Sequence, residues 1–155
     1  MEDFLIRREL IIFNSEETTV EGIFKEASEL LLEKGYVHDT YMDALLEREN
    51  EHPTALELEN IRIAIPHADP RHVKKGGIMV VKLDKTATFQ SMLDKKKVEV
   101  SHVFFLILTN GTTHLEALSG LMTMMQKKEK VEQIKACKSA DELYQVLQDS
   151  MELDS

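Results

Sequence analysis

The chain has 155 residues, 43% of them hydrophobic and 30% charged, and its formal net charge is −9. This profile predicts one globular domain over residues 1–155 and excludes disordered and fibrous chains. The acidic balance argues against nucleic-acid binding, because phosphate backbones are held mainly by Lys and Arg. A single cysteine allows no internal disulfide, and the longest strongly apolar run, residues 103–108, is too short to span a bilayer. We therefore expect a cytoplasmic protein with no direct insertion into a membrane.

The N-terminal part of the chain predicts one extended or helical element and then a clear helix. Residues 4–13 are apolar at both ends with charges between, which fits a strand or a short helix. Thr18 followed by Glu21 is typical of a capping box at the start of a helix. Gly35 stands where a helix-ending glycine belongs.

A second helix is expected from Asp39, a good N-cap residue, to about Asn50. Pro53 ends it, and a loop is expected through about Asn60. The residues predicted for its buried side are Tyr41, Met42, Leu45 and Leu46.

The middle of the chain predicts strands. Residues 61–65 alternate Ile with Arg or Ala, and residues 78–83 are apolar and β-branched. Residues 86–89 form another candidate strand. Residues 98–108 become continuously apolar, as expected of a strand that is covered on both faces.

The last third predicts helices again. Thr113 with Glu116, and Ser139 with Glu142, have the spacing of capping boxes. The helix opened by Thr113 should bury Leu115, Leu118, Met122 and Met125, with Met124 the most exposed of its methionines. The whole pattern predicts an α/β fold: a single layered domain with one mixed, mostly parallel sheet of about five strands flanked by helices.

The segment that indicates chemistry is residues 61–69. Pro66 lacks an N–H, so the strand should stop there and present His67 at its end, where α/β sheets usually place ligand sites. An imidazole in that position can titrate near neutral pH and act as a nucleophile.

Two further groups would suit a phosphoryl group beside His67. His114 lies at the start of the helix opened by Thr113, where the amides of Thr112 and Thr113 would cradle an anion. Arg48 can grip phosphate oxygens bidentately. If the strand ending near Ile65 lies beside the strand ending near residue 108, these loops emerge at the same edge of the sheet.

These residues carry a family resemblance that spans nearly the whole chain. The block Asp43-Ala44-Leu45-Leu46-Glu47-Arg48-Glu49, then Pro53-Thr54, then Ile63-Ala64-Ile65-Pro66-His67 resembles the fructose/mannitol/galactitol class of phosphotransferase system IIA domains. Residues 35–40 and 51–56 are most similar to the galactitol type.

The resemblance implies a phosphotransferase that carries phosphate on a histidine, matching His67. It implies the HPr phosphocarrier as donor, a cysteine of a IIB component as acceptor, and a membrane IIC component coupled to uptake of a sugar or sugar alcohol. The family's arginine matches Arg48, and its second histidine, where present, matches His114. Galactitol-type members need not keep that second histidine. No cofactor and no metal are implied, and an apolar surface for HPr should flank His67.

Two alternatives stay open at this point. One alternative prediction is a regulatory module of the same fold, which controls a partner protein by its phosphorylation state. A metal-dependent hydrolase using His67, His72 and an acid is the third hypothesis, although the spacing of these histidines matches no standard ligand set. The other histidines, including His102, are expected to be structural, and Cys137 is expected to be a lone thiol.

Overall fold

A five-stranded sheet forms the middle layer of the protein. The computed structural model describes residues 6–154, and within them the side chains outside residues 111–114 and 150–154. The strand order is β1-β4-β5-β3-β2. β1 pairs with β4 and β3 with β5 in parallel, whereas β4–β5 and β2–β3 are antiparallel. The strands are β1 (Ile6–Ser15), β2 (Ala55–Glu57), β3 (Arg62–Ala64), β4 (Gly77–Gln90) and β5 (Lys97–Ile107).

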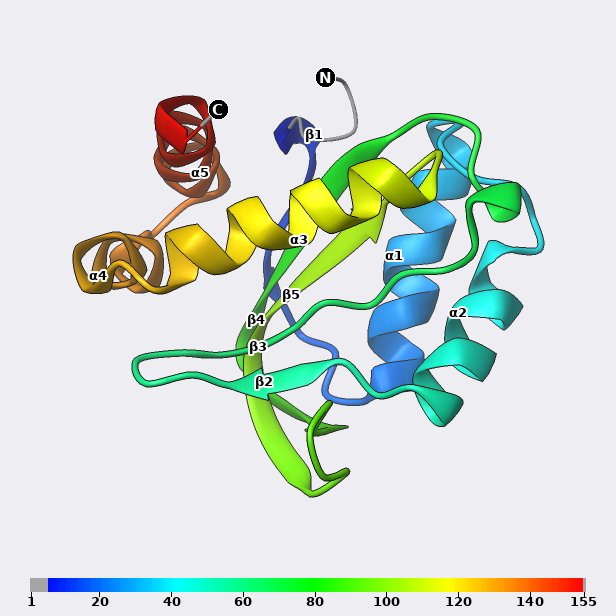
Figure 1. Ribbon diagram of the computed structural model, residues 1–155, viewed down its shortest axis with the longest axis horizontal. Helices are drawn as coiled ribbons and strands as arrows, with labels where there is room; N and C mark the ends of the chain where they lie inside the picture. The colour runs from blue at the N-terminus through cyan, green and yellow to red at the C-terminus, as the bar shows by residue number, and fades with distance from the viewer. Residues whose placement is uncertain (1–5, 155) are drawn as a thin grey trace.

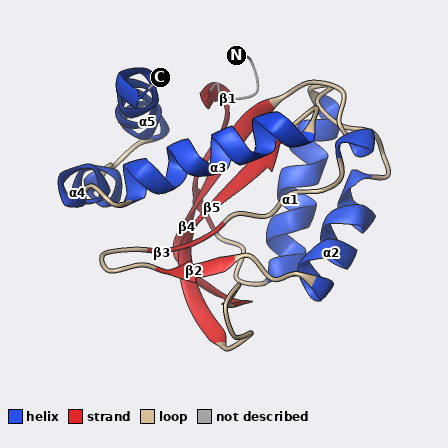
Figure 2. Ribbon diagram, viewed as in Figure 1, coloured by secondary structure: helices blue, strands red, loops and turns tan. Residues whose placement is uncertain are grey.

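Helices cover both faces of this sheet, as Figures 1 and 2 show, and the predicted α/β fold with a mixed sheet is confirmed. One face packs against α1 and α2, and the other against α3, α4 and α5. A short 3₁₀ turn follows β3. The helices are α1 (Val20–Glu33), α2 (Tyr41–Glu51), α3 (Gly111–Met125), α4 (Lys128–Ala136) and α5 (Ala140–Asp154), and the 3₁₀ turn is η2 (Pro70–His72).

The sheet separates two apolar cores. Along β5, Val103, Phe105 and Ile107 face the α1 and α2 side, and Phe104 and Leu106 face the opposite side. All five are fully or almost fully buried, so β5 is covered on both faces as predicted. No helix in the part of the chain that the structure describes is both long enough and apolar enough to cross a membrane.

Helix starts differ from the prediction by one or two residues. α1 is capped by Thr19, whose side chain accepts a hydrogen bond from the amide of Gly22, and not by Thr18. The N-cap of α2 is Thr40 instead of Asp39. α3 begins at Gly111, so Thr113 lies within its first turn and not at its cap. These shifts follow from neighbouring residues that can serve equally well as the first non-helical position.

Other predicted boundaries are confirmed by specific bonds. Gly35 has a φ of 79°, the left-handed conformation that ends α1 and that glycine adopts without strain. At α5, the Ser139 hydroxyl accepts from the amide of Glu142, whose carboxylate in turn accepts from the amide of Lys138.

Three elements differ from the expectation. The predicted loop before Asn60 contains β2, and the two predicted strands over residues 78–83 and 86–89 are the single strand β4. α4 was not predicted as a separate helix.

In α3, Met124 is fully buried and Leu115 is 69% exposed, which is the reverse of the prediction. The stripe of α3 that faces the sheet is formed by Ala117, Leu121 and Met124.

Candidate functional site

Backbone hydrogen bonds to Thr54 on one side and to β5 on the other hold the segment that leads to His67. β3 ends at Ala64, and the amide of Ile65 donates to the carbonyl of Thr54 at 3.2 Å. Pro66 has no N–H to continue that ladder, but its carbonyl accepts from the amide of Leu106 at 3.1 Å. The segment therefore leaves the sheet at a defined point, with His67 directly after the last bond to β5.

The imidazole of His67 is partly exposed, and its Nδ1 lies 3.3 Å from the carbonyl oxygen of Ile65. A carbonyl oxygen only accepts hydrogen bonds, so the neutral ring that makes this contact carries its proton on Nδ1. The lone pair of the ring then lies on Nε2. The contact is a long hydrogen bond, and it orients the imidazole through the local backbone.

β3 and β5 lie side by side and parallel, as the hypothesis about a shared edge required. Ile63 pairs with His102 and Ala64 with Val103. β5 ends at Ile107, and α3 begins at Gly111. The end of β3 and the amino end of α3 therefore emerge at the same edge of the sheet (Figure 1).

Three of the predicted site residues belong to the first turn of that helix. The side chains of Thr112, Thr113 and His114 lie outside the described residues, so their parts in the site stay predictions. The backbone of the turn is helical, which leaves its first amide groups without partners inside the helix.

Arg48 lies in the last turn of α2, with its side chain exposed. Its carbonyl accepts from the amide of His52, which closes the helix. Among the described residues it forms no ion pair with Glu47 or Glu51. The structure therefore leaves the guanidinium at the surface of the helix end that leads into β2.

Glu49, which follows Arg48 in α2, is a buried carboxylate that was not predicted as part of the site. Its side chain is only 9% exposed and accepts two hydrogen bonds from Thr54, one from the amide and one from the hydroxyl, both at 2.9 Å. Burial raises the pKa of the Glu49 carboxyl, and the bonds from Thr54 and the charge of Arg48 oppose that rise. The signal in the sequence was its position, because Tyr41, Leu45 and Glu49 follow one another at helical spacing on the buried side of α2.

The side chains of His72 and Cys137, which also carry chemistry, bond to groups outside the proposed site. His72 bonds through Nδ1 to the hydroxyl of Thr40 at 2.7 Å, and its Nε2 accepts from Arg71. The half-buried thiol of Cys137 bonds to the carbonyl of Gln133, and burial raises its pKa. Across the described residues, no three His, Cys, Asp or Glu side chains come together as a metal site would need.

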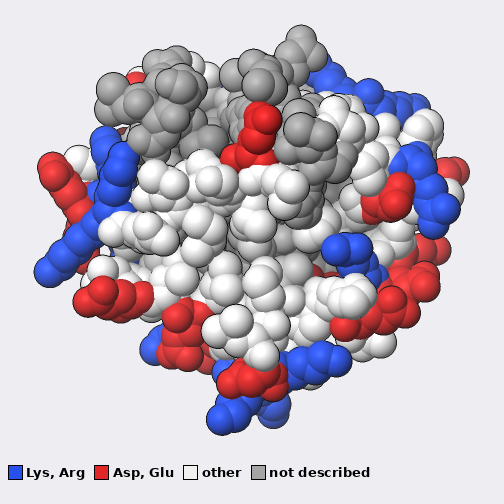
Figure 3. Space-filling model, in the orientation of Figure 1, with Lys and Arg blue, Asp and Glu red and all other residues white. Residues whose placement is uncertain are grey.

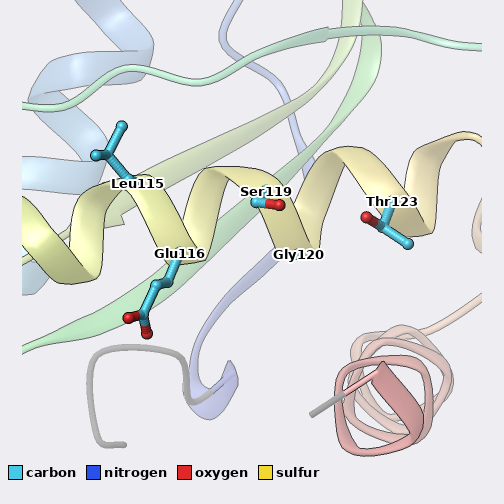
Figure 4. Close-up of a pocket in the computed structure, with 5 residues that line it drawn as sticks. All are labelled: Leu115, Glu116, Ser119, Gly120 and Thr123. Atoms are coloured by element: carbon cyan, nitrogen blue, oxygen red, sulfur yellow. The ribbon is translucent and has the colours of Figure 1, made fainter.

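A hollow of about 430 Å³ lies along α3 (Figure 4). The lining residues that the structure describes come from that helix, and none of them was a candidate for the site. The lining residues are Leu115, Glu116, Ser119, Gly120 and Thr123.

His102 is structural, as predicted, and it gives the protein an expected sensitivity to acid. Its side chain is 3% exposed, and Nε2 has no hydrogen-bond partner among the residues that the structure describes. Burial, together with the charges of Lys82 and Lys135, lowers its pKa from 6.5 to about 4. The unfolded chain therefore takes up a proton as pH falls below about 6.5, whereas the native ring resists it until about pH 4. This difference should remove about 3 kcal/mol from the free energy of unfolding over that interval.

Denaturant unfolding of wild type and His102→Phe between pH 7.5 and 4.5 checks this prediction. The wild type should lose stability relative to the variant as pH falls, because phenylalanine cannot bind the proton. His38→Phe, at an exposed histidine, should keep the wild-type pH dependence. Parallel curves for wild type and His102→Phe would show that His102 does not carry the effect.

Comparison with known proteins places this site in context. Residues 4–150 match the family described as "Phosphoenolpyruvate-dependent sugar phosphotransferase system, EIIA 2". The chain is 39% identical over 102 residues to the galactitol-specific EIIA component of Escherichia coli, covering 66% of this chain and 68% of the relative. It is 32% identical over 146 residues to the mannitol-specific IIA component of Halalkalibacterium halodurans, covering 92% of this chain and 94% of the relative.

Solved structures agree with this match. The crystal structure of IIA mannitol from Escherichia coli aligns with a TM-score of 0.76 at 26% identity, covering 93% of this chain and 99% of that one. The complex of enzyme IIA mannitol with phosphorylated enzyme IIB mannitol from the same species aligns with a TM-score of 0.74 at 25% identity, covering 92% and 96%.

Proposed function

Since this chain belongs to the EIIA 2 family of the phosphoenolpyruvate-dependent sugar phosphotransferase system, we propose that it carries a phosphoryl group on His67. The chain is a phosphotransferase of the sugar-specific IIA type. The observation that carries the assignment to His67 is its placement. A partly exposed imidazole, oriented by the Ile65 carbonyl, follows β3 at the sheet edge where α3 begins.

The transfer uses Nε2 of His67 as the nucleophile. Nε2 forms a bond to the phosphorus of phospho-HPr as the bond from that phosphorus to its atom on HPr breaks. Nδ1 keeps its proton and donates it in the hydrogen bond to the Ile65 carbonyl throughout, so the ring needs no outside base. In the next step a cysteine thiolate of a IIB component attacks the same phosphorus, and the Nε2–phosphorus bond breaks. No cofactor or metal enters either step, since the phosphoryl group arrives already activated.

Charge stabilisation is assigned to the start of α3 and the end of α2. The amides of Thr112 and Thr113 at the start of α3 are proposed to meet the equatorial oxygens, together with His114. Arg48 at the end of α2 neutralises the charge that gathers on those oxygens. The parallel pairing of β3 with β5 supports the first of these contacts, because it puts the start of α3 at the edge where His67 stands.

A docking surface for HPr and IIB is expected around this edge. Figure 3 shows a zone without Lys, Arg, Asp or Glu in the middle of the face that α3 crosses, with charged residues around it. Leu115 of α3 is 69% exposed, as a residue that meets a partner protein would be. The solved IIA–IIB complex of the mannitol system supports a IIB component as the partner. The similarity to the galactitol-specific relative supports galactitol or a related sugar alcohol as the substrate of the whole system.

Reconstitution tests the proposed function. The chain is incubated with enzyme I, HPr and labelled phosphoenolpyruvate, and a galactitol-type IIB component is then added. Label should appear on the chain and move to the IIB cysteine. Label that stays on the chain with every IIB component tested would favour the regulatory module instead. A chain that takes no label from HPr would contradict the proposal.

A further inference from the structure

Glu49 links the end of α2 to the strand that leads to His67. α2 passes into β2 within a few residues (Figure 1), and the turn between them is fastened by the Glu49 carboxylate. One carboxylate oxygen accepts from the Thr54 amide and the other from the Thr54 hydroxyl. Both side chains are buried, at 9% and 3% exposure, so water does not compete for these bonds.

Thr54 in turn fixes the residue that orients the imidazole. Its carbonyl accepts from the amide of Ile65, and the carbonyl of Ile65 accepts from Nδ1 of His67. The path from the carboxylate to the imidazole therefore runs through Thr54 and Ile65 by hydrogen bonds of 2.9, 3.2 and 3.3 Å. The last of these is the longest, so it is the bond most sensitive to a small shift of the Ile65 carbonyl.

The same carboxylate also holds the helix turn next to it. Arg48 precedes Glu49 in the last turn of α2, so anchoring Glu49 in the interior sets how that turn meets β2. The bond from the His52 amide to the Arg48 carbonyl closes the same turn, and the Glu49 carboxylate ties it to the residue before β2.

From these contacts we infer that Glu49 is a positioning residue for the phosphoryl site: through Thr54 it sets the ring orientation of His67 and the place of Arg48. The inference rests on the proposed function of His67. Its chemistry is geometric, because both carboxylate oxygens act as acceptors of fixed donors and neither reaches the phosphoryl group. Glutamine can reproduce the arrangement, with its oxygen accepting from the Thr54 amide and its NH₂ donating to the Thr54 hydroxyl.

The test compares Glu49→Ala with Glu49→Gln in the full chain. Two readouts are used: the ring tautomer of His67, from ¹⁵N spectra of histidine-labelled protein, and the rate of phosphoryl acceptance from phospho-HPr. Glu49→Ala should lower the rate about tenfold, since a misplacement of about 1 Å costs up to about a hundredfold. It should also shift the His67 ring away from the Nδ1–H tautomer. Glu49→Gln should stay within about twofold of wild type in rate and keep the wild-type tautomer.

Two controls separate positioning from stability. Glu47→Ala changes an exposed carboxylate on the same helix and should leave both readouts unchanged. Leu46→Ala removes a partly buried side chain from α2, and it should lower the melting temperature without altering the His67 tautomer. If Glu49→Ala does not fold, Thr54→Val replaces it, because valine keeps the amide donor and loses only the hydroxyl; Thr54→Ser is its matched control.

The inference is overturned if the folded Glu49→Ala variant, or Thr54→Val in its place, keeps both the wild-type tautomer and the wild-type rate. Failure of the proposed function looks different. In that case the wild type itself takes no phosphate from HPr, while the ring spectra of the variants still report whether Glu49 orients His67.

Discussion

Replacing His67 by glutamine is expected to abolish phosphoryl acceptance while the fold stays intact. Glutamine offers an amide of similar reach but no nitrogen lone pair that can attack phosphorus, so the covalent intermediate cannot form. The rate of labelling from phospho-HPr should fall at least about a thousandfold. The fold should survive, because the bonds that hold this segment, from Leu106 to the Pro66 carbonyl and from Ile65 to Thr54, use only the backbone.

The control for this variant is His38→Gln, at an exposed histidine beyond the end of α1. It should take up label at the wild-type rate. Circular dichroism and thermal unfolding of both variants establish that they are folded. Undiminished labelling of folded His67→Gln would remove His67 from the mechanism.

Replacing Arg48 by alanine is expected to slow the transfer about a hundredfold. The guanidinium is the fixed positive charge that we assign to the phosphoryl oxygens from the α2 side, and its loss leaves the developing charge to the amides of α3. Arg48→Lys should retain part of the rate, since an ammonium keeps the charge but not the bidentate fork. Stopped-flow or quenched-flow labelling from phospho-HPr measures both variants.

Arg62 provides a matched control for Arg48. It is also an exposed arginine, at the start of β3, and its guanidinium pairs with Glu57 at 3.0 Å. Arg62→Ala should keep the wild-type rate. If Arg48→Ala behaves like Arg62→Ala, then Arg48 is only a solvated surface charge and has no part in the transfer.

How far the fold could be predicted depended on the length of each element. The helices α1 and α2 were predicted from apolar residues at helical spacing, and the strand β5 from its long, continuously apolar run. The strand β2 has three residues and one ladder partner, so its sequence carries no alternation to recognise. β4 was divided in two because charged residues interrupt it where its register against β5 shifts, between Lys82 and Ala87.

Site residues could be predicted where the residue type and its position in the sequence together indicate a chemical role. The Pro66–His67 pair at a strand end was visible in the sequence, and the parallel neighbour that brings α3 to the same edge was stated as a condition and is confirmed. Glu49 was missed because a glutamate among charged neighbours is usually solvated. Only the packing of Tyr41 and Leu45 on the same side of α2 shows that its carboxylate turns inward.

The most direct test of the central claim is the position of the phosphoryl group on the protein. The chain is labelled with ¹⁵N in its histidine rings, phosphorylated through HPr, and examined by ³¹P–¹⁵N coupling under alkaline conditions that preserve phosphohistidine. The hydrogen bond from Nδ1 to the Ile65 carbonyl predicts phosphorus bonded to Nε2 of His67. Phosphorus on Nδ1 of that ring, or on any other residue, would contradict the account.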